Sequence, residues 1–225
     1  MPRGNKTYFN GDRYEGELQG DVRNGHGTYF FANGNKYEGN WRNNVIDGKG
    51  TFFWTDGSKY DGEWKNGKRN GKGTYSLKNG TKYEGNWNND LPDGQGNMYW
   101  NDGHKYEGHL SQNKFHGKGT FSWNNGVKYE GEWDNNKKTG KGKLFFNNGN
   151  RYEGSFKNDK FEGNGTHFYN NGERYEGNWS NGMCNGNGTY YFNNGDKTVG
   201  NFSQNKATGN HSRNCANGQH QTVLY

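Results

Sequence analysis

The stretch YEGNWRNNVIDGKGTFFWTDGSK, residues 37–59, decides the fold because the chain repeats it many times without any change in length. It opens on Tyr-Glu-Gly, places a tryptophan four residues after the tyrosine, and passes through a polar segment to Gly-x-Gly, an aromatic run and an Asp-Gly turn. The opening tyrosine recurs every 23 residues, at Tyr14, Tyr37, Tyr60, Tyr83, Tyr106, Tyr129, Tyr152 and Tyr175. A fixed period between about 20 and 50 residues is the signature of a repeat architecture.

Each repeat is expected to form a pair of β-strands. Tyr37, Gly39 and Trp41 alternate with polar residues, and a second alternating stretch runs from Gly48 to Trp54. Alternation with period two predicts half-buried strands. Residues 42–47 are expected to join the two strands as a loop, and the Asp56-Gly57 dipeptide predicts a type I′ turn into the next repeat. The predicted fold is all-β, an elongated single-layer antiparallel sheet of stacked 23-residue hairpins.

The ends of the chain depart from the period. Residues 1–13 are interpreted as an N-terminal half-repeat, and residues 14–211 as an array of about nine units. The ninth unit is degenerate because Thr198 replaces the opening tyrosine and His211 replaces a glycine. Residues 212–225 show no period and are expected to form a C-terminal tail.

The composition allows a folded chain despite its polarity. A mean hydropathy of -1.50 with 26% hydrophobic residues would ordinarily indicate disorder, but aromatic residues reach 17% and recur in register. Large rings bury much area per residue, and the glycines of the first strand and of Gly-x-Gly are expected to lie beneath them. The two cysteines form no CxxC pattern, which favours a reduced, intracellular protein, and no signal peptide or transmembrane stretch is predicted.

The opposite face of the predicted sheet carries charged columns and one aromatic column. Lysine or arginine precedes each opening tyrosine and glutamate or aspartate follows it, which predicts a mixed, solvated ladder. Outward aromatic residues either pack with neighbours or contact a partner. The candidate partner-binding residues are Phe30, Phe53, Tyr99, Phe145, Phe168 and Tyr191.

The excess positive charge is expected along one edge of the middle repeats. A basic edge attracts acidic segments or anionic lipid head groups, although a simple solubilising surface is an equal alternative. The candidate residues of this basic edge are Lys65, Lys68, Arg69, Lys72, Lys114, Lys118, Lys137 and Lys138.

No catalytic, metal-binding or cofactor-binding residues are predicted. The closest histidines, His104, His109 and His116, occupy different columns of the repeat, and no cysteine or carboxylate column completes a metal set. The Gly-x-Gly motif precedes a strand rather than a helix, so it is no nucleotide-binding loop. Nucleic acid is not expected as a partner because the aromatic residues alternate onto the packed face, away from most lysines.

The Y-E-G-x-W motif, the Gly-x-Gly and the Asn-Gly turn at a 23-residue period resemble the MORN repeat. This resemblance covers residues from about Tyr14 to Gly209. It implies a non-catalytic scaffold for other protein subunits, and the layout is most similar to MORN-type radial spoke head subunits of cilia. The implied location is the cytoplasm and cytoskeleton, in the axoneme of a cilium or flagellum. The alternative function is a membrane-recognition module that binds anionic phospholipid through the basic edge; a homodimer is a further possibility.

Overall fold

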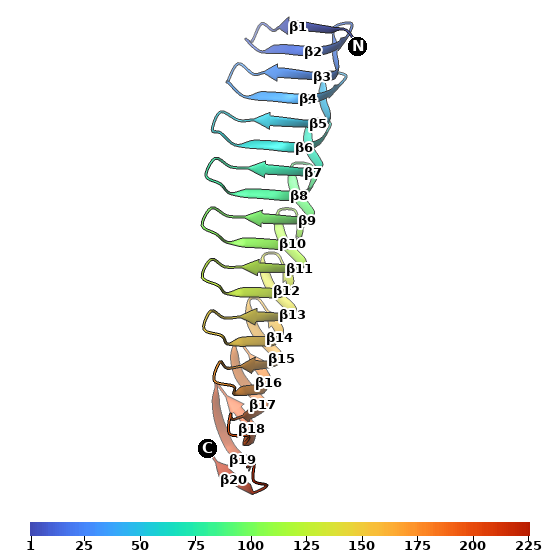
Figure 1. Cartoon of the computed structure of the whole chain (residues 1–225). Coiled ribbons are helices and arrows are strands. Elements are labelled where there is room, and N and C mark those ends of the chain that lie inside the picture. Colours follow the sequence, from blue (N-terminus) through green and yellow to red (C-terminus); the bar gives the residue numbers. More distant parts are fainter. The chain divides into compact units, whose positions relative to one another are not determined.

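The computed structural model describes all 225 residues, which fold into two compact units, Met1–Lys114 and Phe115–Tyr225. Both units are built only from β-strands joined by turns, and no helix capable of crossing a membrane is present. Consecutive strands pair antiparallel, so each unit is an open, single-layer sheet of stacked hairpins (Figure 1). The expected all-β fold class is therefore confirmed.

The first unit contains ten complete strands, and from β2 onward strands of seven and nine residues alternate. They are β1 (Arg3–Thr7), β2 (Arg13–Gln19), β3 (Val22–Phe30), β4 (Lys36–Arg42), β5 (Val45–Phe53), β6 (Lys59–Lys65), β7 (Lys68–Ser76), β8 (Lys82–Asn88), β9 (Leu91–Tyr99) and β10 (Lys105–Ser111).

The second unit follows the same plan, and it contains all of its first strand, β11, except Lys114. Its strands are β11 (Lys114–Ser122), β12 (Lys128–Asp134), β13 (Lys137–Phe145), β14 (Arg151–Lys157), β15 (Lys160–Phe168), β16 (Arg174–Ser180), β17 (Met183–Tyr191), β18 (Lys197–Ser203), β19 (Lys206–Asn214) and β20 (His220–Leu224).

The connection inside a repeat is a tight turn, where a loop over residues 42–47 was predicted. Strand β4 ends at Arg42 and β5 begins at Val45, so only Asn43 and Asn44 lie between them. Both have positive φ, 49° and 67°. Two consecutive positive φ values define the type I′ turn, which matches the twist of a hairpin. Asparagine tolerates this conformation better than most residues, which explains part of the asparagine abundance.

The connection between repeats is a different turn from the predicted type I′. In the loop Thr55-Asp56-Gly57 only the glycine has a positive φ, 87°. The Gly57 N–H donates to Trp54 O at 3.1 Å, and the Trp54 N–H donates to Ser58 O at 3.0 Å. This geometry is the three-residue hairpin loop, a type I turn followed by a left-handed glycine. The Asp56 side chain accepts from the Ser58 N–H at 2.8 Å and fixes the turn.

A β-bulge interrupts the pairing inside repeats of both units, as between β6 and β7 in the first and between β16 and β17 in the second. In β6 and β7, Gly62 faces Gly73, whereas Trp64 faces Arg69. One residue of β6 therefore opposes three residues of β7, and Gly71 within the bulge has a φ of 71°. Since the bulge adds two residues, the alternation of faces continues unchanged beyond it.

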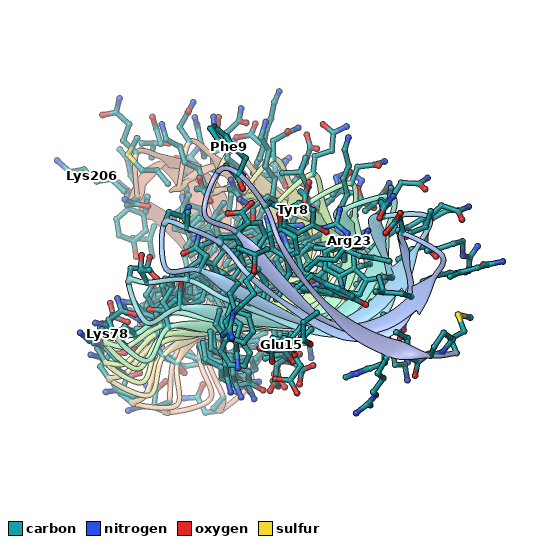
Figure 2. All side chains as sticks on the ribbon, turned by 90° about the horizontal axis from the view of Figure 1, so that it is seen from above. Tyr8, Phe9, Glu15, Arg23, Lys78 and Lys206 are labelled. Carbon is teal, nitrogen blue, oxygen red and sulfur yellow. The ribbon has the colours of Figure 1, made fainter.

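The core lies on one face of the sheet, here called the aromatic face. The tyrosine that opens each of the eight regular repeats is at most 4% exposed. In Figure 2, Tyr8 and Arg23 lie on one side of the first strands and Glu15 lies on the other, here called the charged face. The predicted division into a packed face and a charged face is thus confirmed.

The end of the chain is structured, which corrects the predicted tail at residues 212–225. Strand β20 pairs with β19, and Gly218 occupies the position of the turn glycines with a φ of 87°. The Gly218 N–H donates to Cys215 O at 3.0 Å, as Gly57 does to Trp54. Asn217-Gly218 lies one period after the preceding Asn-Gly turn, so this signal was present in the sequence.

Candidate binding surfaces

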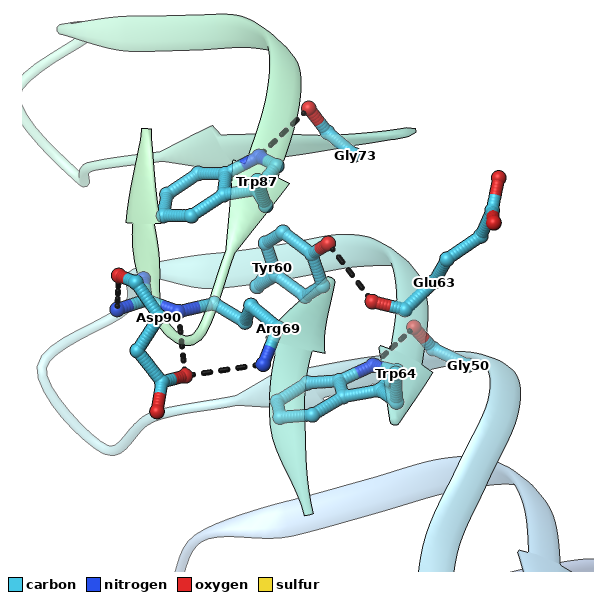
Figure 3. A network of polar contacts seen from close by, with 8 residues as sticks. All are labelled: Gly50, Tyr60, Glu63, Trp64, Arg69, Gly73, Trp87 and Asp90. Atoms are coloured by element: carbon cyan, nitrogen blue, oxygen red, sulfur yellow. Dashed lines mark hydrogen bonds and ion pairs between the residues drawn. The ribbon is translucent and has the colours of Figure 1, made fainter. Parts of the chain in front are cut away.

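The core of a repeat is a network of ring contacts and hydrogen bonds, shown in Figure 3. The Tyr60 hydroxyl donates to the backbone oxygen of Glu63 at 3.0 Å, and the Trp64 indole N–H donates to Gly50 O at 3.0 Å. The Tyr60 ring meets Trp64 and Trp87 edge-on, with centroids 5.0 and 5.2 Å away. Burial raises the pKa of Tyr60, so its hydroxyl remains a neutral donor.

Two of the glycine columns make room for these rings. A Cβ added to Gly73 would lie 2.2 Å from the Tyr60 hydroxyl, and one added to Gly62 would lie 2.6 Å from it. These two columns lie beneath the rings, as predicted. The column of Gly71 was expected there too, but its glycine serves the bulge: the φ is positive, and an added Cβ would meet the Glu63 carboxylate.

Two residues predicted for the basic edge instead point onto the aromatic face. The Arg69 guanidinium lies 4.4 Å above the Trp87 ring, and it donates to Asp90 Oδ1 at 3.2 Å and to Asp90 O at 2.9 Å (Figure 3). Lys138 lies 3.8 Å from Asp159, and burial lowers its pKa. Arg69 and Lys138 both follow the turn inside a repeat, in the segment that was predicted to be a loop. Arg69 and Lys138 are therefore parts of the core surface.

The other residues predicted for the basic edge are solvent-exposed. Lys65 and Lys68 face each other across the tight turn between β6 and β7. Lys72 lies on the same strand as Lys68 and is exposed on the charged face. The exposed members of the predicted edge are Lys65, Lys68, Lys72 and Lys114 in the first unit, and Lys118 and Lys137 in the second. Their binding of an anionic partner stays a prediction.

Each outward aromatic residue is covered by the cation that immediately precedes the opening tyrosine of its repeat. Lys36 faces Phe53 in the register, with its Nζ 4.3 Å from the ring centroid. Arg174 caps Tyr191 at 3.6 Å in the same way. Corresponding cations cover the rest of the column, Phe30, Tyr99, Phe145 and Phe168. Cation–π packing gives this column a role within the sheet, and contact with a partner stays a prediction.

The predicted ladder of opposite charges is present on the charged face. Lys82 and Glu84 lie 2.6 Å apart, and Arg174 and Glu176 also lie 2.6 Å apart. Such exposed pairs contribute about 0.2–1 kcal/mol each. The ladder therefore orders the surface cations more than it stabilises the fold.

Hollows open on both faces, and none was predicted. In the first unit, a hollow of about 610 Å³ on the charged face is lined by Lys72, Glu84 and neighbouring amides. Another of about 320 Å³ on the aromatic face lies beside Leu77 and Met98, where neighbouring repeats carry larger rings. In the second unit, a hollow of about 290 Å³ adjoins Cys184. The sequence signal for the hollow beside Leu77 and Met98 is that both residues are smaller than the rings at these positions of neighbouring repeats. The signal for the hollow beside Cys184 is that a small residue stands where other repeats carry a cation or a ring.

The titratable groups show no metal-binding cluster: no group of three or more His, Cys, Asp or Glu side chains could hold an ion. Both cysteines are free. Burial raises the pKa of the Cys184 thiol to about 11, which keeps it protonated at neutral pH.

Comparison with known proteins gives a clear family match. The family model of the MORN repeat matches eight consecutive segments, residues 14–36, 37–59, 60–82, 83–105, 106–128, 129–151, 152–174 and 175–197. No curated protein matches the chain.

Solved structures with similar strands show low identity. The wild-type TCP10 domain of Danio rerio CPAP is 12% identical, with 99% of this chain and 100% of that chain covered and a TM-score of 0.45. The Drosophila melanogaster SAS-4 TCP domain, in complex with a proline-rich motif of Ana2, is 14% identical, with 80% of this chain and 86% of that chain covered and a TM-score of 0.38. Virginiamycin B lyase from Staphylococcus aureus is 11% identical, with 100% of this chain and 84% of that chain covered and a TM-score of 0.17. These scores are too low for any conclusion about this chain.

Proposed function

The protein belongs to the MORN-repeat family, and from this we propose that it is a non-catalytic scaffold that holds other protein subunits in an assembly. One observation carries the proposal. The recurring residues are engaged within the array itself: Tyr60 donates to Glu63 of its own repeat, Trp64 donates to Gly50 of the preceding repeat, and Gly62 and Gly73 make room for the Tyr60 ring. The recurring chemistry therefore builds the sheet, and the variable positions on its two faces are left to contact partners.

The assembly that we propose is the radial spoke head of the ciliary axoneme. This rests on resemblance, because the matched repeats span residues 14–197 and a repeat-dominated layout is similar to that of MORN-type spoke head subunits. A cytoplasmic, cytoskeletal location in a cilium or flagellum follows from the same proposal. The partners would be spoke proteins that contact the faces of the sheet.

The test is fractionation of ciliated cells that express the chain with a tag. We expect the tagged chain to remain with demembranated axonemes and to co-purify with spoke proteins after salt extraction. Recovery in the soluble fraction alone would contradict the spoke assignment. Recovery with another cytoskeletal assembly would contradict the location while retaining the scaffold.

A second candidate function is recognition of an anionic membrane surface. The observation that favours it is the exposure of Lys65 and Lys68 on opposite sides of one turn, with Lys72 also exposed on the strand that Lys68 begins. Each basic side chain near an anionic surface contributes about 1 kcal/mol, and the attraction weakens in salt.

Vesicle flotation tests this second candidate. We expect the chain to float with vesicles of phosphatidylcholine and phosphatidylserine but not with phosphatidylcholine alone, and to lose binding after Lys65→Ala with Lys68→Ala. A matched control is Lys59→Ala with Lys197→Ala, which removes the same charge elsewhere. Equal flotation with both kinds of vesicle would contradict the electrostatic mechanism.

A further inference from the structure

One position of the aromatic face holds a cation in some repeats and an uncharged residue in others. Along the period it is occupied by Arg23, Ile46, Arg69, Pro92, Phe115, Lys138, Phe161, Cys184 and Ala207. Each cation lies over rings: Arg23 is 4.4 Å from the Trp41 centroid, Arg69 is 4.4 Å from Trp87, and Lys138 is 5.4 Å from Trp123. The aromatic face is thus shaped to receive a cation at this point of the repeat.

The surroundings of Arg23 show how the cation is held. Its guanidinium lies 4.8 Å from the Tyr29 centroid and 5.7 Å from that of Tyr8. Arg23 Nε donates to Asn44 Oδ1 at 3.3 Å, and a terminal nitrogen donates to Asn44 O at 2.9 Å. The Tyr29 hydroxyl donates to Asp12 Oδ2 at 2.6 Å, which places a carboxylate beside the site.

The same surroundings recur seven repeats later, around Cys184. The residues in the places of Tyr8, Tyr29, Trp41, Asn44 and Asp12 are Tyr169, Tyr190, Phe202, Asn205 and Glu173.

Their geometry also corresponds. The Tyr190 hydroxyl donates to Glu173 Oε2 at 2.6 Å, as Tyr29 does to Asp12. Asn205 Oδ1 accepts from the backbone N–H of Cys184 at 2.8 Å, as Asn44 Oδ1 accepts from the backbone N–H of Arg23 at 2.9 Å. The cation itself is missing here: the short Cys184 side chain takes its place and leaves the hollow of about 290 Å³.

We propose that this hollow binds the guanidinium group of an arginine side chain presented by a partner protein. The rings of Tyr169, Tyr190 and Phe202 would form the walls, and Asn205 would supply the two acceptors, its Oδ1 and its backbone oxygen. The Glu173 carboxylate complements the positive charge. An arginine fits better than a lysine because a planar guanidinium can donate to both acceptors at once, as Arg23 and Arg69 do to theirs.

Two further properties of the hollow agree with a cationic guest. His167 lines it, and its buried Nδ1 has no hydrogen-bond partner. Burial lowers the pKa of His167, so at neutral pH the imidazole is uncharged and does not repel a cation. In the preceding repeat the equivalent position holds Phe161, which stacks on Tyr152 at 3.7 Å and fills the space with its own ring. Cys184 does not fill the space in this way.

The proposal rests on the scaffold function in one respect, that the arginine belongs to another protein.

The first experiment uses the full chain and nuclear magnetic resonance with N-acetyl-arginine methylamide as the probe. We expect saturable shifts at the amides of Cys184 and Asn205. The uncharged citrulline analogue should bind at least about tenfold more weakly, because it loses the cation–π attraction of several rings.

The second arm distinguishes the kind of cation. Tetramethylammonium carries the charge but has no N–H donor for Asn205, so it should bind more weakly than the arginine probe. Stronger binding of tetramethylammonium would overturn the guanidinium assignment. Equal shifts with arginine and citrulline, or shifts confined to other residues, would overturn the site.

A pair of variants separates the hollow from general charge effects. Cys184→Arg should fill the hollow with its own guanidinium, raise the thermal midpoint and abolish the probe shifts at Asn205. Met183→Arg is the matched control, since it adds the same charge at an exposed position one residue away and should leave the binding unchanged. Probe binding that persists in folded Cys184→Arg would contradict the proposal. Axoneme fractionation does not depend on these outcomes, so the two proposals can fail separately.

Discussion

The repeat that opens at Tyr60 and the one that opens at Thr198 place a ring in the same space but take it from different strands. In the first, the Tyr60 ring lies over Gly62 and Gly73, and its hydroxyl donates to Glu63 O at 3.0 Å. In the second, Thr198 has no ring, and His211 replaces the glycine of the next strand that corresponds to Gly73, one of the two that lie beneath the ring in the first repeat.

His211 fills the place that the tyrosine leaves. It is fully buried, and a Cβ added to Gly200 would lie 2.5 Å from its ring. Its Nε2–H donates to Asn201 O at 2.8 Å, the carbonyl three residues after Thr198, just as Tyr60 donates to the carbonyl of Glu63. The ninth repeat, expected to be degenerate, is therefore compensated. What the fold requires is a ring over one glycine and a donor to one carbonyl, and either strand can supply both.

The largest difference between the two kinds of repeat should appear at alkaline pH. Burial raises the pKa of the opening tyrosines above their ordinary value of 10.0, as at Tyr37, Tyr60 and Tyr129. Their contribution to stability is complete below pH 10 and is lost as the pH rises above it, because the unfolded chain ionises first. The loss approaches about 1.4 kcal/mol per pH unit for each buried tyrosine. Thr198 contributes nothing to this loss.

Urea unfolding at a series of pH values, followed by circular dichroism and by tyrosinate absorbance, measures this effect. We expect the unfolding midpoint to fall steeply above pH 10 and most tyrosinate absorbance to appear together with unfolding. Ionisation of all tyrosines at their ordinary pKa in the folded chain would show that the rings are less buried than described.

A side chain added at a glycine beneath a ring should have the next largest effect. A Cβ on Gly85 would lie 2.5 Å from the Tyr83 hydroxyl and 2.6 Å from the Gly96 backbone. We expect Gly85→Val to lower the free energy of unfolding by about 3 kcal/mol, because neither neighbour can move away. Lys82→Ala, at a partly exposed ion pair in the same strand, should cost no more than about 1 kcal/mol. Similar unfolding midpoints for the two variants would mean that the faces are assigned incorrectly.

The smallest effect should come from the hydroxyl alone. Tyr60→Phe keeps the ring but removes the donor to Glu63 O. We expect a loss of about 1 kcal/mol in the free energy of unfolding, the usual value for one hydrogen bond. Urea unfolding at neutral pH measures it. A loss as large as that of Gly85→Val would indicate that the hydrogen bond, rather than the ring, holds the repeat together.

The sequence predicted the repeat, the two faces and the place of the rings because these follow from spacing alone. The glycines beneath Tyr60 could be placed since alternation survives the bulge, which adds two residues to one strand. The bulge itself was not predictable: Gly71 looks like Gly73 in the sequence, and only the φ of 71° separates their roles.

The candidate sites were predicted less well. Residues 65–70 were interpreted as a loop, so the partners of Arg69 on the aromatic face were missed. The turn Asn43-Asn44 lacks the glycine that usually marks type I′. The cap of Lys36 over Phe53 depends on strand register, which periodicity does not supply. Thr198 and His211 both depart from the period and lie 13 residues apart. Each departure, taken alone, predicts a degenerate repeat, and only the structure shows that His211 replaces the missing ring.

The most direct test of the exchangeable ring is a double-mutant cycle in the ninth repeat with Thr198→Tyr and His211→Gly. Alone, Thr198→Tyr should crowd His211, and His211→Gly should leave a cavity, each lowering the free energy of unfolding by about 2 kcal/mol. Together they recreate the regular repeat, so the double variant should lie within about 1 kcal/mol of the parent, a coupling of about 3 kcal/mol. Additive losses, with the double variant about 4 kcal/mol less stable than the parent, would contradict the claim that the two rings occupy one site.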